Sequence, residues 1–203
     1  MNAPASHLRA RLKSSTSARH AALDAHPAMA GLTEPGFPLP RYRALLQAHH
    51  AFLSWVEPPL EEALERLGLP FPYGHRRKLP LVERDLRWFG LVPEGALPPP
   101  SASPPTTLPA LAGVLYVLEG STLGGQLIAR ALERHLALGP TTGAAYFQGY
   151  GAETRARWVE VLAFLDQAAS DEAQLLEAER YAHLTFELFG QALERVQLSP
   201  SPA

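Results

Sequence analysis

Proline is unevenly distributed along the chain, and this distribution limits which regular structures the sequence can form. The chain has 20 prolines, most of them in clusters with long tracts between them. Proline lacks an amide hydrogen and its ring clashes with the preceding helical turn, so each cluster interrupts regular structure. The clusters lie in residues 35–40, 58–59, 70–72, 93–109 and 200–202. The intervening tracts are long enough for helices.

Six tracts carry apolar residues at helical spacing, and no stretch alternates as a strand would. In the first, Leu8, Leu12 and Thr16 recur every four residues. Thr107 and Ser170 each precede a tract and are predicted to cap it, and Pro58-Pro59 predicts a kink within the second tract. The tracts are residues 6–24, 41–67, 79–89, 108–138, 151–168 and 171–196. The sequence therefore predicts an all-α fold.

Length and composition favour one globular domain. The 203 residues are 46% hydrophobic with a net charge of -2, too apolar for a disordered chain. We expect a single domain over residues 1–203, with a helical core at 6–196, a proline-rich surface loop at 93–109 and a flexible tail at 197–203. No uninterrupted apolar run approaches the roughly 18 residues of a membrane span. We therefore expect a soluble, cytoplasmic protein that does not bind a membrane.

Two further features of composition exclude classes of function. The chain has no cysteine, so any metal must be held by histidine or carboxylate. The sequence pI of about 6.4 gives no electrostatic reason to expect a nucleic acid partner. Walker A, Gly-x-Gly-x-x-Gly and Gly-x-Ser-x-Gly patterns are absent, as are Glu-x-x-His and His-Glu-x-x-His pairs.

His49 and His50 are adjacent in the sequence. Neighbouring residues face different sides of a helix, so the two make a poor ligand pair and are predicted to face solvent.

The first candidate motif lies at residues 13–24. On a helix, His20 and Asp24 are one turn apart, so one imidazole nitrogen could bind a metal while the other donates to the carboxylate. Lys13 lies two turns earlier on the same face, where it could meet an anionic group. The alternative is that His20 is an ordinary surface histidine of an amphipathic helix.

The second candidate motif is the glycine-rich stretch at residues 115–126. Each glycine within a helix costs about 1 kcal/mol relative to alanine. Gly120, Gly124 and Gly125 therefore require a compensating role. Gly120 and Gly124 share a face, where a flat ligand could approach the backbone and the helix could bend. The alternative is close packing of this helix against another one.

Together the two motifs resemble the heme oxygenases. Residues 12–24 read Leu-Lys-x-x-Thr-x-x-x-His-x-x-x-Asp, and residues 118–126 read Leu-Glu-Gly-Ser-x-x-Gly-Gly-Gln. The sequence of residues 116–125 is similar to that of bacterial members that supply biliverdin to phytochromes. The segments at 146–151 and 182–186 support this similarity. The resemblance covers roughly residues 8 to 193.

The resemblance implies a multi-helical bundle that holds heme between a proximal N-terminal helix and a kinked, glycine-rich distal helix. His20 would then be the iron ligand. Animal members carry aspartate at the position of Ser121, where it organises water, and serine cannot act as a carboxylate. The remaining roles implied by the resemblance are a catalytic distal wall of Gly120, Ser121 and Gly124, and heme contacts from Lys13, Thr16, Asp24, Tyr116, Gly125 and Arg157, with Arg155 a further candidate.

The activity implied by the resemblance is cleavage of heme to biliverdin, with release of carbon monoxide and ferrous iron. It consumes dioxygen and electrons, and because the chain has no flavin or nucleotide motif, the electrons would come from a ferredoxin or a reductase. A phytochrome apoprotein would be a recipient of the product. Two alternatives remain: a heme carrier that keeps His20 without turnover, and a helical scaffold of the same fold that binds no heme.

Overall fold

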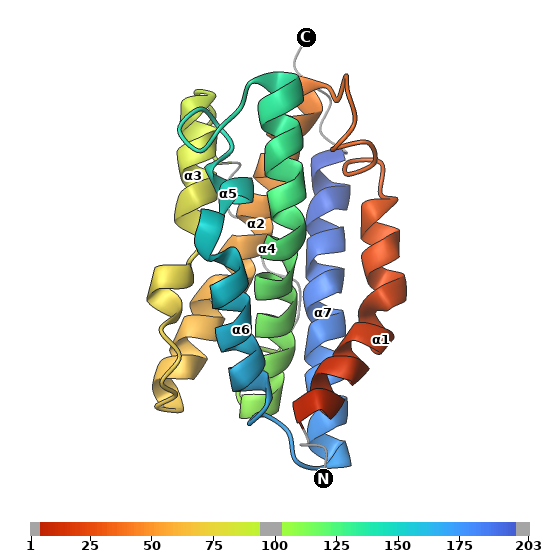
Figure 1. Cartoon of the computed structure of the whole chain (residues 1–203), viewed down its shortest axis with the longest axis vertical. Coiled ribbons are helices and arrows are strands. Elements are labelled where there is room, and N and C mark those ends of the chain that lie inside the picture. The colour runs from red at the N-terminus through yellow and green to blue at the C-terminus, as the bar shows by residue number, and fades with distance from the viewer. Residues whose placement is uncertain (1–4, 94–102, 198–203) are drawn as a thin grey trace.

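The computed structural model describes residues 5–93 and 103–197, and within these ranges the fold is all-helical (Figure 1). The prediction of an all-α fold is therefore confirmed, and no described residue lies in a strand. The elements are α1 (Ala5–Asp24), α2 (Leu39–Arg66), η1 (Tyr73–Arg76), α3 (Leu79–Trp88), α4 (Leu108–Leu136), α5 (Ala145–Gln148), η2 (Gly151–Glu153), α6 (Thr154–Leu165) and α7 (Glu172–Gln197).

Helix α4 lies at the centre of the bundle and packs against α2, α5, α6 and α7 (Figure 1). Its first half is almost entirely buried, with Ala110, Leu111 and Leu115 fully enclosed. Gly113 permits a close crossing with α7, because a Cβ at this position would lie 2.2 Å from the carbonyl oxygen of Ala178. Substitution there would force the two helices apart.

Helix α1 is attached mainly to α7. Leu8 and Leu12 are fully buried at this contact. The Arg11 guanidinium forms ion pairs with Glu172 at 2.7 Å and Glu179 at 2.9 Å, and the imidazole Nε2 of His183 lies 3.1 Å from the carbonyl oxygen of Ser15. These contacts set the face that the C-terminal half of α1 presents to the interior.

The helix starts follow the capping rules, with one correction. Thr107 caps α4 as predicted, its hydroxyl accepting a hydrogen bond from the Ala110 amide at 3.2 Å. Proline also stands in the first turn of α2, α3 and α4, where its missing amide hydrogen costs nothing. The prediction that Ser170 caps the last helix is wrong: Asp171 accepts from the Gln174 amide at 2.9 Å, and Ser170 instead donates to the Gln174 side chain.

Several element boundaries in the structure differ from the predicted ones. The tract at 151–168 becomes η2 and the shorter α6, and residues 145–148 form the single turn α5. The proline-rich connector is shorter than predicted, because residues 108 and 109 already belong to α4; residues 94–102 lie outside the described residues, as does the tail at 198–203. Pro58 and Pro59 lie inside α2, which continues through them.

Helix α4 is also the one described helix with the length and hydropathy to cross a membrane. Counting only uninterrupted apolar runs missed this, because glycine, serine and threonine are interspersed along the helix. In the structure 44% of the apolar window is buried inside the bundle, and the glycine-rich part of the helix lines a cavity.

Candidate functional site

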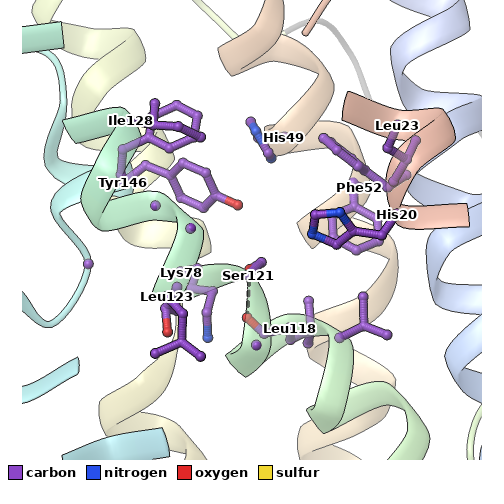
Figure 2. A pocket seen from close by; sticks show the side chains of 18 of the residues that line it. His20, Leu23, His49, Phe52, Lys78, Leu118, Ser121, Leu123, Ile128 and Tyr146 are labelled. Atoms are coloured by element: carbon purple, nitrogen blue, oxygen red, sulfur yellow. Dashed lines mark hydrogen bonds between the residues drawn. The ribbon is translucent and has the colours of Figure 1, made fainter. Parts of the chain in front are cut away.

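One cavity of about 340 Å³ opens between α1, α2, α4 and α7. This volume lies in the range of small-molecule sites, and its walls are mostly apolar. Figure 2 shows side chains from several helices converging on it. The lining residues include Thr16, His20, Leu23, Asp24, Met29, His49, Phe52, Lys78, Tyr116, Leu118, Gly120, Ser121, Leu123, Gly124, Gly125, Ile128, Tyr146, Phe147, Tyr150, Trp158, Phe186 and Phe189.

Most of the predicted site residues meet at this cavity. The eight that line it are Thr16, His20, Asp24, Tyr116, Gly120, Ser121, Gly124 and Gly125. Lys13 and Arg157 are not among the lining residues. Lys13 is exposed on α1, and the Arg157 guanidinium pairs with Glu153 at 3.0 Å and Glu160 at 3.7 Å. The two predicted cationic contacts are therefore outside the cavity wall, and Arg155 is also exposed and outside it.

His20 stands on the last two turns of α1 with its predicted partner in reach. Its Nδ1 lies 2.9 Å from an Asp24 carboxylate oxygen. A carboxylate can only accept, so in the neutral ring Nδ1 carries the proton and Nε2 keeps the electron pair that a metal would use. The side chains are 65% and 64% exposed, and the imidazole meets the edge of the Phe186 ring at 6.2 Å. His20 is accessible to a ligand in the cavity.

The glycines of α4 divide into two kinds according to what a side chain would meet. A Cβ at Gly124 would have no described atom within 4 Å, and one at Gly120 would meet only the Trp158 ring at 3.7 Å. Gly125 differs, because its Cβ would lie 3.2 Å from the Phe147 carbonyl oxygen. Helix packing thus accounts for Gly113 and Gly125, whereas Gly120 and Gly124 leave bare backbone facing the cavity.

Helix α4 bends in this glycine-rich segment (Figure 2). Two hydroxyls bond back to the preceding turn: Ser121 donates to the Leu118 carbonyl at 2.8 Å and Thr122 to the Glu119 carbonyl at 2.6 Å. Such back-bonding weakens the regular helical ladder and bends helices, and glycine removes the side chains that would resist. The bend brings the backbone of Gly120 and the exposed Ser121 hydroxyl to the cavity.

Thr16 and Tyr116 join the walls contributed by α1 and α4. The Thr16 hydroxyl is buried and donates to the Leu12 carbonyl at 2.6 Å. Burial raises the pKa of the Tyr116 phenol, and its hydrogen bond with Thr16 opposes that rise. The Tyr116 ring packs near Trp158 with centroids 5.9 Å apart. Tyr116 therefore stays neutral and able to donate a hydrogen bond.

A buried ion cluster beside the cavity was not predicted. Glu119 is 1% exposed, and its carboxylate accepts from Lys78 at 2.5 Å, Arg76 at 2.8 Å and the Tyr150 hydroxyl at 2.9 Å. Arg76 also contacts Glu160. Two of these residues, Lys78 and Tyr150, line the cavity. The signal available in the sequence was one carboxylate, Glu119, directly after the apolar run at 108–118. Its partners could be identified only from the folded structure.

Two carboxylates far from the glycine-rich motif position other cavity residues. Glu57, fully buried on α2, accepts from the Lys78 amide at 2.6 Å and the Leu79 amide at 3.1 Å, at the start of α3. Asp85 accepts from the amides of Ala145 and Tyr146, each at 2.8 Å, at the start of α5. Burial raises the pKa of Asp85, and these two bonds partly offset that rise. Sequence analysis missed both contacts.

The expectation that His49 faces solvent is wrong. His49 is 5% exposed and lines the cavity from α2, because this face of α2 packs on α7. His50, its neighbour, turns away and lies 4.0 Å from Glu83. His49 packs among the aromatic rings of Tyr146, at 4.4 Å, and Phe189, at 4.7 Å.

Comparison with known proteins shows which family the chain belongs to. The chain is 35% identical over 153 residues to a heme oxygenase of Xanthomonas campestris pv. campestris strain 8004, covering 75% of this chain and 88% of that protein. The chain belongs to the heme oxygenase family. The family model described as heme oxygenase matches residues 101–195, which include the glycine-rich helix α4.

The fold of this family member matches solved structures of low sequence identity. A heme oxygenase of Neisseria meningitidis has a TM-score of 0.77 at 20% identity, covering 100% of this chain and 96% of that one. Heme oxygenase 2 of Chlamydomonas reinhardtii, solved without heme, has 0.70 at 18%, covering 97% and 99%. The heme oxygenase of Leptospira interrogans has 0.64 at 20%, covering 91% and 98%. These likenesses concern the arrangement of the helices.

Proposed function

We propose that this heme oxygenase opens heme to biliverdin, releasing carbon monoxide and ferrous iron and using dioxygen and external electrons. The observation that carries the proposal is one cavity lined from α1 by an imidazole with a carboxylate partner, and from α4 by backbone free of side chains. A heme carrier needs only the imidazole and its carboxylate partner. The bare backbone of α4 also leaves space for dioxygen beside the ligand.

The side chains present fit an iron porphyrin. A neutral imidazole is a common axial ligand of heme iron, and His20 is accessible with its other nitrogen engaged by Asp24. The described residues contain no cluster of three metal-binding side chains, so a metal that brings its own four ring ligands suits this site. Apolar groups for a porphyrin face come from Leu23, Met29, Phe52, Leu118, Leu123, Ile128 and Phe186.

Each wall would contribute differently to the reaction. When bound, heme supplies the iron that activates dioxygen against the porphyrin's own carbon. His20 would hold the iron, and Asp24 would fix the ring orientation and increase the electron density at the ligating nitrogen. Gly120 and Gly124 would leave space on the opposite side for a small molecule and ordered water.

Ser121 would act as a water-holding group at the position where animal members carry aspartate. Its hydrogen is donated to the Leu118 carbonyl, so the hydroxyl oxygen is left as an acceptor facing the cavity. It can position a water molecule but cannot exchange a proton as a carboxylate does. We propose that the distal wall of Gly120, Ser121 and Gly124 directs dioxygen toward one porphyrin carbon through shape and water.

We also propose that the propionates of heme lie near the mouth of the cavity and meet cationic groups there. Lys13 precedes His20 by two helical turns, about 10 Å along the axis, and its long side chain can reach toward that edge. Arg157 would have to exchange its contacts with Glu153 and Glu160. Thr16, Tyr116 and Gly125 would contact the heme from within the walls.

The partners and compartment are further proposals. A ferredoxin or a separate reductase would deliver electrons, because the sequence has no nucleotide-binding pattern. A phytochrome apoprotein as recipient of biliverdin rests on the resemblance of residues 116–125 to that bacterial branch. A cytoplasmic location would suit both partners.

An absorbance time course tests the activity. Protein loaded with ferric heme is given a reductant under air, beside His20→Ala and the control His135→Ala, a histidine outside the cavity. Conversion of the heme bands to those of biliverdin in the parent and control, but not in His20→Ala, is the expected result. Heme that binds through His20 and persists with several reductants would favour the carrier, and no specific binding would favour the scaffold.

A further inference from the structure

His49 is a buried polar residue that the proposed reaction does not yet use. It lies near the middle of α2 and is 5% exposed. In Figure 2 its ring stands between Tyr146 and Ile128 on one side and Phe52 and His20 on the other. His49 therefore lines the cavity between His20, which would ligate iron, and the side chains of α4 and α5 on the other side.

Both ring nitrogens of His49 are enclosed and have no hydrogen-bond partner among the described residues. The surrounding groups are aromatic: Tyr146 at 4.4 Å, Phe189 stacked at 4.7 Å and Phe147 edge-on at 5.5 Å. Burial lowers the pKa of His49 to about 3, so the ring is neutral, with one N–H donor and one acceptor nitrogen. Neither capacity is satisfied by the protein.

A structural role does not explain this arrangement. Buried polar groups in folded proteins almost always have a partner, and leaving one without a partner costs free energy that an apolar side chain would not. Leucine or phenylalanine would fill the same aromatic surroundings without that cost. The other cavity residues with buried polar groups, Lys78 and Thr16, are each bonded within the protein. His49 stands apart in this respect.

We propose that His49 hydrogen-bonds the small polar molecule, water or a diatomic ligand, that shares the cavity with heme. The proposal rests on the proposed function, since it assigns a partner within the same cavity. A neutral imidazole can donate to such a molecule and can equally accept from a water, so it holds either without adding charge to the apolar cavity. The Tyr146 hydroxyl, which points into the cavity in Figure 2, is the adjacent polar group.

Cyanide binding to the ferric heme complex is the first test, because it measures the hydrogen bond without turnover. His49→Leu removes the donor, His49→Gln keeps one, and His50→Leu controls for loss of the neighbouring imidazole. We expect His49→Leu to weaken cyanide binding about tenfold, the loss expected for one good hydrogen bond, with His49→Gln close to the parent and His50→Leu unchanged. Equal cyanide affinity in all four proteins would overturn the proposal.

Nitrogen-15 NMR of the histidine side chains and urea unfolding supply readouts apart from the loaded enzyme's activity. The ring shifts of His49, assigned by their absence in His49→Gln, should change between heme-free and cyanide-bound protein. Heme-free His49→Leu should resist urea at least as well as the parent. Unchanged shifts, or a marked loss of stability with intact cyanide affinity, would assign His49 to packing alone. Absence of a His20-dependent heme spectrum would instead contradict the proposed function itself.

Discussion

Glu119 and Lys78 form an ion pair of 2.5 Å inside the protein, one residue before the glycine wall of the cavity begins. Their side chains are 1% and 4% exposed. The pair ties the segment before α3 to the centre of α4, at the turn where that helix bends. Arg76 and Tyr150 complete the surroundings of the same carboxylate. The position of Gly120 is thus fixed by charges from a distant part of the sequence.

Neutralising Glu119 should destabilise the protein strongly. In Glu119→Gln, the enclosed Lys78 loses its counter-charge and Arg76 keeps only Glu160, and breaking a buried ion pair in this way costs about 3–5 kcal/mol of the free energy of unfolding. Glu160→Gln is the matched control, because it contacts the same Arg76 but is 52% exposed, and its loss should cost about 1 kcal/mol or less. Urea unfolding of the heme-free proteins measures both. Equal losses of unfolding free energy in the two variants would mean that burial of Glu119 does not increase its contribution to stability.

Filling the space beside Gly124 should leave the fold intact and impair heme binding. Nothing described lies within 4 Å of a Cβ there, so Gly124→Leu should fold, and Gly124→Ala should gain about 1 kcal/mol of helix stability. Gly113→Ala should instead destabilise the bundle, because its Cβ would meet α7. Heme titration and urea unfolding are run on all three. Unchanged heme affinity and turnover in Gly124→Leu would count against the distal wall.

Removing the carboxylate beside His20 should weaken the axial bond without unfolding α1. Asp24 is 64% exposed, so Asp24→Ala changes the orientation and electron density of the imidazole more than the packing. In ferrous, heme-loaded protein, resonance Raman should show a lower iron–histidine stretching frequency. Asp24→Asn, which can still accept a hydrogen bond, should shift less. An unaltered frequency in both variants would remove Asp24 from this role.

The buried imidazole of His49 should make the protein sensitive to acid. Its folded pKa, about 3, lies below the unfolded value of 6.5, so the unfolded chain takes up a proton that the folded chain resists. No stability is lost from this group above pH 6.5, and the free energy of unfolding then falls by up to about 1.4 kcal/mol per pH unit toward pH 3. Between pH 6.5 and 4.5 the parent should lose about 2–3 kcal/mol more than His49→Gln. Parallel urea profiles for the two proteins would contradict this.

Much of the site could be predicted because its residues are close in sequence. Helical spacing alone places His20 and Asp24 on one face, and the observed contact of 2.9 Å follows from one helical turn. The free-energy cost of glycine in a helix likewise marked Gly120 and Gly124. These inferences need only the local geometry of a single helix.

The rest of the site could not be predicted from the sequence, because it depends on how the helices pack against one another. The face of α2 that is buried is decided by α7, so adjacency of His49 and His50 gave no basis for choosing between them. Lys78 and Tyr150 reach the cavity through Glu119, a contact across 41 and 31 residues of sequence. Arg157 was placed by resemblance and Lys13 by helical spacing as well as resemblance. In the structure the Arg157 guanidinium pairs with Glu153 and Glu160, and Lys13 is exposed.

The two principal walls of the cavity are supported very unequally. Helix α4 is surrounded by α2, α5, α6 and α7, whereas α1 rests on α7 and, more sparsely, on α6. Several of the polar links between α1 and α7 lie at or near the surface, among them the contact of Arg19 with Glu187. The wall that carries His20 is accordingly the more compliant one. Entry of a flat, rigid macrocycle would displace α1 at far lower free-energy cost than α4. The same holds for the exit of a longer, open-chain product. The N-terminal helix is thus the wall that moves during ligand exchange, and the glycine-rich helix is the wall that stays in place.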